Sequence, residues 1–170
     1  MEVTDQRYRS LVAKICRDIA VSNWRPDYIV GLTRGGLIPA VMISHYFDIP
    51  MYALHVTSNP ENNESNLWMS ENAYGYEEGN VVNVRKNILI VDDINDTGAT
   101  LNWIMEDWQS SCLPKDPKWN NIWNSNVRFA VIVDNLASNC SVAMDYIGLE
   151  VNKAEEDVWI EFPYEAWWRI

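Results

Sequence analysis

Apolar residues recur along the chain in two alternating patterns: short continuous runs and longer stretches with helical spacing. The short runs are mostly β-branched and predict strands at residues 28–30, 51–56, 88–91 and 127–133. The longer stretches predict helices at residues 8–21, 37–47 and 101–109. Strands that are apolar throughout and alternate with helices are typical of a parallel sheet covered on both faces. The pattern therefore predicts an α/β fold with a twisted, mostly parallel sheet.

A polar turn with one glycine follows the apolar run at residues 88–91 and leads into the predicted helix at 101–109. Two adjacent carboxylates, Asp92 and Asp93, come directly after the run. The turn itself comprises Asp96, Thr97, Gly98, Ala99 and Thr100. Backbone N–H groups of such a turn bind phosphate with the help of the helix dipole, and threonine hydroxyls add donors. Adjacent carboxylates suit ribose hydroxyls or Mg²⁺, so the segment predicts a ligand site at the end of a strand.

A second turn of this kind follows the run at residues 28–30 and leads into the predicted helix at 37–47. It comprises Thr33, Arg34, Gly35 and Gly36. Glycines let the backbone approach an anion closely, and the arginine supplies a positive charge. Each turn alone also suits a plain structural connection, and Asp-Asp-x-x-Asp is also a metal-binding pattern on the helices of prenyl-converting enzymes. The β-branched run before Asp92 favours a strand over such a helix, and two such turns together favour a binding site.

Composition and charge narrow the class of protein. The chain has 170 residues, 48% of them apolar, which is enough for a single domain over residues 1–170. Its formal net charge of −11 argues against nucleic acid as a partner. An anionic substrate then needs local positive charge, which makes Mg²⁺ part of the hypothesis. The polar N-terminus, the lack of a membrane-length apolar run and three scattered cysteines predict a cytoplasmic protein with no membrane partner.

Residues 91–100, VDDINDTGAT, resemble the phosphoribosyl-pyrophosphate (PRPP) signature of the type I phosphoribosyltransferases. The resemblance implies that Asp92 and Asp93 contact the ribose hydroxyls and bind Mg²⁺ partly through substrate and water. It also implies that residues 96–100 cradle the 5′-phosphate. The turn at residues 33–36 resembles the pyrophosphate loop of the same family, in which the peptide matching Thr33–Arg34 can be cis.

Residues 158–164, VWIEFPY, resemble the purine-binding segment of bacterial xanthine-guanine phosphoribosyltransferases. The resemblance implies that Trp159 stacks on the purine and that the backbone of Ile160 reads its edge. Without it, Trp159 is better explained as a core or interface aromatic. Asn135 stands where the 6-oxopurine members have a base-contacting lysine, and it can donate a hydrogen bond but lacks the charge. Asp96 is typical of those members, because a carboxylate near N7 can accept the proton that the purine sheds.

The resemblance implies a type I phosphoribosyltransferase fold with a small C-terminal hood over residues 150–170 and a homo-oligomer, either a dimer or a tetramer. Residues 57–80 are expected to form a flexible flap; a disordered insert is the alternative. The expected reaction joins xanthine, guanine or hypoxanthine to the phosphoribosyl group of PRPP and releases pyrophosphate, as in purine salvage. Two alternatives are a phosphoribosyltransferase for another nucleobase and a non-catalytic regulator that senses PRPP or nucleotides.

Overall fold

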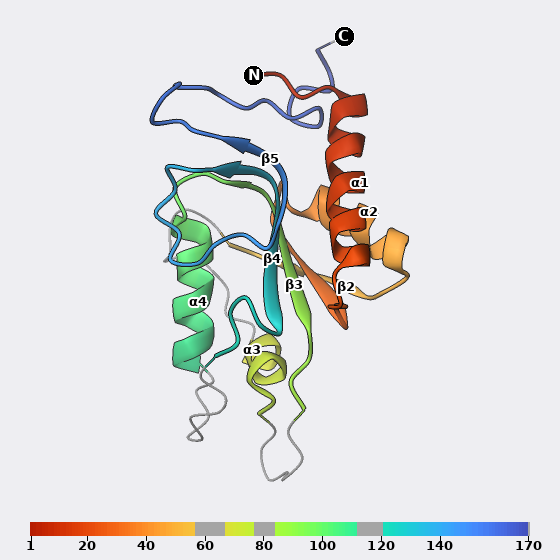
Figure 1. Ribbon diagram of the computed structural model, residues 1–170, viewed down its shortest axis with the longest axis vertical. Coiled ribbons are helices and arrows are strands. Elements are labelled where there is room, and N and C mark those ends of the chain that lie inside the picture. Colours follow the sequence, from red (N-terminus) through yellow and green to blue (C-terminus); the bar gives the residue numbers. More distant parts are fainter. Residues whose placement is uncertain (57–66, 77–83, 112–120, 170) are drawn as a thin grey trace.

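The computed structural model describes residues 1–56, 67–76, 84–111 and 121–169. Within these residues, five parallel strands form one sheet in the order β2-β1-β3-β4-β5 (Figure 1). The strands are β1 (Tyr28–Leu32), β2 (Met51–Leu54), β3 (Ile88–Asn95), β4 (Val127–Asn135) and β5 (Tyr146–Val151). The helices are α1 (Asp5–Val21), α2 (Leu37–Phe47), α3 (Leu67–Tyr74) and α4 (Ala99–Ser111). The predicted α/β fold with a parallel sheet is therefore confirmed.

Helices cover both faces of the sheet. Helices α1 and α2 lie on one face and α3 and α4 on the other (Figure 1). Successive residues of β3 alternate between the two cores: Leu89 packs with α1 and α2, and Ile90 packs with α3 and α4. Because both faces are buried, the central strands need apolar residues at every position, which explains their continuous apolar runs.

Strand β3 extends further than its apolar run predicts. Its pairing with β4 continues past Val91, with Asp92 opposite Val131 and Asn95 opposite Asp134. The two adjacent carboxylates therefore lie within the strand, whereas the sequence placed them just after it. Backbone pairing does not depend on side-chain polarity, so the ladder continues where the apolar run stops.

Helix α3 lies in the middle of the segment that was predicted to be a flexible flap. Met69 and Tyr74 of this helix are buried in the core, and the ring of Trp68 lies 5.7 Å from that of Tyr28 and 4.9 Å from that of Tyr52. Residues 67–74 of the predicted flap therefore form a helix packed on the sheet, and the mobility of the flap stays a prediction. Gly75 and Tyr76 follow this helix, and residues 57–66 and 77–80 of the predicted flap lie outside the described residues.

The C-terminal segment, defined here as residues 158–169, lies against the beginning of the chain, and both termini are at the same end of the molecule (Figure 1). Glu2 pairs with Glu161 in a parallel bridge, and the Val3 N–H donates to the Glu161 carbonyl at 2.9 Å. The ring of Phe162 packs edge-on against that of Tyr8 in α1. These contacts hold the C-terminal segment close to the carboxyl ends of the strands. None of the described helices is long and apolar enough to cross a membrane.

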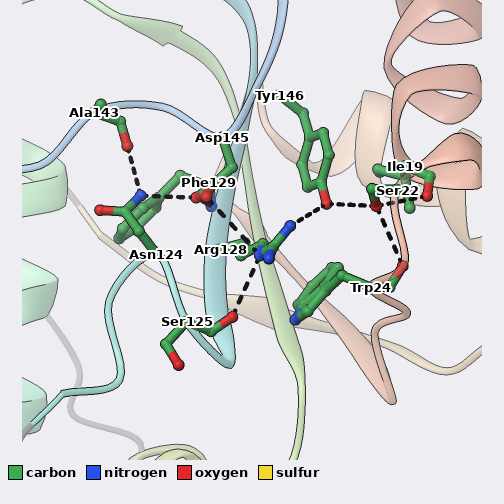
Figure 2. A network of polar contacts seen from close by, with 10 residues as sticks. All are labelled: Ile19, Ser22, Trp24, Asn124, Ser125, Arg128, Phe129, Ala143, Asp145 and Tyr146. Atoms are coloured by element: carbon green, nitrogen blue, oxygen red, sulfur yellow. Dashed lines mark hydrogen bonds and ion pairs between the residues drawn. The ribbon is translucent and has the colours of Figure 1, made fainter.

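A polar network closes the opposite end of the sheet, where β4 and β5 begin (Figure 2). The Arg128 guanidinium donates to the Tyr146 hydroxyl at 2.8 Å and lies 4.9 Å from the centre of the Trp24 ring. The Asp145 carboxylate accepts from the Phe129 N–H at 2.9 Å, and burial raises the pKa of this carboxyl. The network joins the segment after α1 to the beginnings of β4 and β5. It thereby fixes the end of the sheet that lies farthest from the glycine turns.

Candidate active site

The predicted binding turns meet at the carboxyl ends of β1 and β3. They line one cavity of about 230 Å³. The lining residues from the predicted site are Thr33, Arg34, Gly35, Asp92, Asp93, Asp96, Thr97, Gly98, Ala99 and Thr100. Gly36 does not line the cavity and is instead the buried residue that precedes α2. The fold thus brings together two motifs that are far apart in the sequence, as expected at this edge of an open α/β sheet.

The turn between β3 and α4 needs a glycine at position 98. Gly98 has φ = +85°, and a Cβ atom there would lie 2.3 Å from the backbone nitrogen of Cys140. The neighbouring loop also holds the turn through its backbone, because the Asn139 N–H donates to the Thr97 carbonyl at 3.0 Å. Helix α4 begins at Ala99, and the first N–H groups of a helix have no partner within it. This part of the cavity is therefore suited to an anion.

The turn after β1 packs directly against the carboxylate pair. The Thr33–Arg34 peptide is cis, as the resemblance allowed. A Cβ atom at Gly35 would lie 1.7 Å from an oxygen of the Asp93 carboxylate, so any larger residue there would displace that carboxylate. The Thr33 side chain forms a hydrogen bond with Nδ1 of His55 at 3.0 Å. Arg34 is exposed and lines the cavity, which places its charge where an anion would bind.

Asp92 and Asp93 differ in their surroundings. The Asp92 carboxylate accepts from the Asp93 N–H at 3.0 Å, and burial together with the Asp93 charge raises the pKa of Asp92 well above its usual range. The two Asp93 oxygens accept from the Ile94 N–H at 2.9 Å and from the Tyr164 hydroxyl at 2.8 Å. Among the described residues, no three acidic, histidine or cysteine side chains gather as a metal site. Mg²⁺ commonly uses only one or two carboxylates and takes its other ligands from substrate and water, so the pair suits this ion.

Asp96 has a cationic partner that the sequence did not reveal. The Lys153 ammonium lies 3.0 Å from each oxygen of the Asp96 carboxylate. Lys153 follows β5, a strand with mixed burial that gave no continuous apolar run and was not predicted. The Asp96 side chain is 44% exposed and that of Lys153 is 19% exposed, so the pair is partly open to solvent. A carboxylate and an ammonium are thus available together at the turn formed by residues 96–100.

Asn135 lies behind this ion pair. Its Nδ2 donates to the Asp96 carbonyl at 3.0 Å, and its Oδ1 accepts from the N–H groups of Ala137 and Lys153. The residue is only 6% exposed. This position favours a role in holding the Asp96 turn and Lys153 together. Its predicted contact with a purine stays a prediction.

The two C-terminal residues assigned to the purine have opposite environments. The Trp159 side chain is 76% exposed, whereas Ile160 is 6% exposed and belongs to the core beneath α1 and α2. An exposed indole is free to stack on a flat ligand, and a buried Ile160 fixes the backbone beside it. Neither residue lines the 230 Å³ cavity, and their purine contacts stay predictions.

Comparison with known proteins identifies the family. A family model described as a phosphoribosyl transferase domain matches residues 2–166. The hypoxanthine-guanine phosphoribosyltransferase of Schizosaccharomyces pombe is 26% identical, and the match covers 91% of this chain and 85% of that protein. The crystal structure of a purine phosphoribosyltransferase from Pyrococcus horikoshii has a TM-score of 0.64 at 25% identity, covering 97% of this chain and 93% of that one.

The Helicobacter pylori xanthine-guanine-hypoxanthine phosphoribosyltransferase has a TM-score of 0.67 at 16% identity, covering 99% of this chain and 95% of that one. At this identity the likeness concerns the fold, and it agrees with the parallel sheet described above. The family model, in contrast, spans nearly the whole sequence and includes both glycine turns. The chain therefore belongs to the phosphoribosyltransferase family.

Proposed function

We propose that the protein transfers the 5-phosphoribosyl group of PRPP to a 6-oxopurine, giving the nucleoside 5′-monophosphate and pyrophosphate, as in purine salvage. The observation that supports this best is the Asp96–Lys153 pair at the turn formed by residues 96–100. A 6-oxopurine presents N7 and O6 on one edge. A carboxylate can accept the N7 proton, and an ammonium can donate to O6. The 6-amino group of adenine is itself a donor and would face the ammonium without an acceptor.

The bonding changes in the proposed reaction are balanced by groups of this chain. The purine N9 forms the bond to C1′ of the ribose while the bond from C1′ to pyrophosphate breaks. The proton leaves N7 and passes to Asp96, which acts as the general base. The proton transfer runs ahead of the N9–C1′ bond, so negative charge spreads over the purine ring and onto O6, where Lys153 stabilises it until the bond to C1′ neutralises the base.

PRPP is proposed to span the cavity. Asp92 and Asp93 would bind the ribose hydroxyls, and the turn at residues 96–100 would bind the 5′-phosphate through backbone N–H groups and threonine hydroxyls. The turn at residues 33–36 would bind the pyrophosphate, with Arg34 supplying the charge. Mg²⁺ is proposed to bind at Asp92 and Asp93 and, when present, to neutralise part of the pyrophosphate charge.

The remaining substrate contacts are proposed for the C-terminal segment. Trp159 would stack on the purine, and the backbone of Ile160 would read its edge. Asn135 would support the base site through Asp96 and Lys153, to which it is hydrogen-bonded. We also propose a cytoplasmic location.

Helix α2 supports a homo-oligomer, as a dimer or tetramer. Pro39, Ala40 and Ile43 of this helix are buried within the subunit, yet Ile38, Val41 and Tyr46 on its other side are exposed. A helix that is apolar on all sides is usually buried on all sides. Sedimentation velocity at micromolar concentrations measures the state directly, and a monomer would contradict this part of the proposal.

Pyrophosphate release tests the activity. The protein is mixed with PRPP and Mg²⁺, and xanthine, guanine, hypoxanthine, adenine and orotate are each tested separately. Release with one or more oxopurines, and none with adenine or orotate, is the expected result. Release with adenine or orotate alone would refute the oxopurine assignment. PRPP binding without pyrophosphate release in any mixture would refute the proposed enzymatic activity and indicate a regulator that senses PRPP.

A further inference from the structure

We propose that Tyr164 is a positioning residue for PRPP: its hydroxyl fixes the carboxylate of Asp93 in the orientation that receives the ribose. The inference rests on the proposed function and extends it to the C-terminal segment. The Tyr164 O–H donates to Oδ2 of Asp93 at 2.8 Å, and the Ile94 N–H donates to Oδ1 at 2.9 Å. Each carboxylate oxygen therefore has a donor, and together the two donors fix the rotation of the group.

The Tyr164 ring is itself held in place by aromatic neighbours. It stacks on Phe162 with the ring centres 5.5 Å apart and meets the Tyr8 ring edge-on at 5.7 Å. Tyr8 belongs to α1, and Phe162 to the C-terminal segment that pairs with the start of the chain. Aromatic side chains have few rotatable bonds, so this cluster places the hydroxyl at low conformational cost.

The contact also links the two halves of the proposed PRPP site. The Asp93 oxygen that accepts from Tyr164 is the same Oδ2 that lies against Gly35 of the pyrophosphate turn. A second cavity, of about 600 Å³, is bordered by Arg34, Gly35, Asp93 and Tyr164. Tyr164 therefore lies where Asp93, the turn at residues 33–36 and the C-terminal segment meet. If the Asp93 carboxylate turned, it would move relative to Gly35 as well as to the ribose.

A tyrosine hydroxyl carries its proton through the neutral pH range, so Tyr164 can donate to the Asp93 carboxylate wherever the enzyme is assayed.

A matched pair of variants tests the hydroxyl separately from the ring. Tyr164→Phe removes the donor and keeps the ring, whereas Tyr8→Phe removes a hydroxyl from the adjoining ring. The Tyr8 hydroxyl is buried and has no hydrogen-bond partner among the described residues. Both variants keep the aromatic cluster, so their melting temperatures are expected to stay close to that of the wild type.

PRPP affinity is measured by calorimetry with Mg²⁺ and without a purine, and steady-state constants are measured with the preferred base. Tyr164→Phe should raise the Kd and the KM for PRPP roughly 10- to 100-fold, the usual effect of losing a hydrogen bond to a charged group. The KM for the base at saturating PRPP should stay unchanged, and Tyr8→Phe should bind PRPP like the wild type.

Two results would overturn the inference while leaving the proposed function intact. One is wild-type PRPP affinity in Tyr164→Phe. The other is an equal loss in Tyr8→Phe, which would assign the effect to packing of the cluster. Failure of the wild-type protein to bind PRPP would overturn both the inference and the proposed function. This result concerns the wild type, so it is distinguishable from the two variant results above.

Discussion

Replacing Asp92 by asparagine should stabilise the fold and at the same time abolish PRPP binding. The Asp92 carboxylate is buried beside Asp93, and these two causes raise its pKa. Its ionised form therefore costs free energy in the folded state. In the native protein the Asp93 N–H donates to Asp92 Oδ1 at 3.0 Å. Asparagine keeps an oxygen that can accept this hydrogen bond, but it carries no charge. The substitution thus removes repulsion and desolvation without removing the hydrogen bond.

The size of the gain follows from the charges involved. Two unit charges roughly 5 Å apart repel by about 3 kcal/mol at an effective dielectric constant of about 20. Side-chain relaxation lowers this value, so we expect the free energy of unfolding to rise by about 1–2 kcal/mol, as for other single stabilising substitutions. In a domain of this size the melting temperature should then rise by about 2–8 °C.

The gain should depend on pH in a definite direction. An acid whose folded-state pKa lies above its unfolded value binds its proton more readily when folded. The native carboxyl therefore costs nothing below the unfolded pKa, near 4, and its cost grows as the pH rises towards the folded pKa. The advantage of Asp92→Asn should be small near pH 4 and full where the folded-state carboxyl is ionised. Thermal unfolding followed by circular dichroism across this range measures it.

The control variant is Glu106→Gln, which removes one negative charge from an exposed position on α4. It should change the melting temperature little, because its carboxylate is solvated. An equal gain in both variants would show that relief of the net charge of −11, and not the local pair, is responsible. No gain in Asp92→Asn at high pH, or a gain that does not vary with pH, would refute the account of Asp92. PRPP titration by calorimetry checks the accompanying loss of binding.

Three further substitutions test other parts of the site. Asp96→Asn should lower turnover by about 10²–10⁴-fold with PRPP affinity near normal, and unchanged turnover would contradict its role as general base. Lys153→Met should raise the KM for the oxopurine about tenfold at unchanged PRPP affinity, as expected when one charged donor is lost, and an unaltered base KM would exclude its contact with O6. Gly98→Ala should destabilise the fold by about 2–5 kcal/mol in urea unfolding, since it combines a left-handed φ with overpacking against Cys140, and a stable variant would refute that clash.

The central strands and the two glycine turns were predictable because their signals are local. A strand buried on both faces must be apolar throughout, and residues 88–91 show this directly. The predicted bounds of α2, residues 37–47, agree with the structure. The edge strand β5 was missed because it is only partly buried and its residues form no apolar run. Helix α3 was missed because it is short and lies between polar stretches.

The contacts that complete the site were not predictable, because they join residues far apart in the sequence. The Lys153–Asp96 bond spans 57 positions and the Tyr164–Asp93 bond spans 71. No local pattern marks either partner, since an isolated lysine or tyrosine is compatible with any exposed position. The sequence led us to look for a base-contacting cation at Asn135. The structure instead places an ammonium, that of Lys153, just after β5, and Asn135 is buried behind the Asp96–Lys153 pair and hydrogen-bonded to both residues.

The proposed substrate and the protein are both anionic, so the site must create its own positive potential. The pyrophosphate and the 5′-phosphate of PRPP are each assigned to a glycine turn that leads into a helix. The first turn leads into α2, which begins at Leu37, and the second into α4, which begins at Ala99. The positive ends of both helix dipoles therefore lie at one edge of the sheet, and the overall charge of −11 does not alter their direction. Fixed dipoles need no reorganisation as charge develops on the leaving pyrophosphate. Because backbone dipoles are assigned to the phosphates, the titratable side chains can serve the other parts of the substrates. Asp92 and Asp93 are assigned to the ribose, and Asp96 and Lys153 to the base.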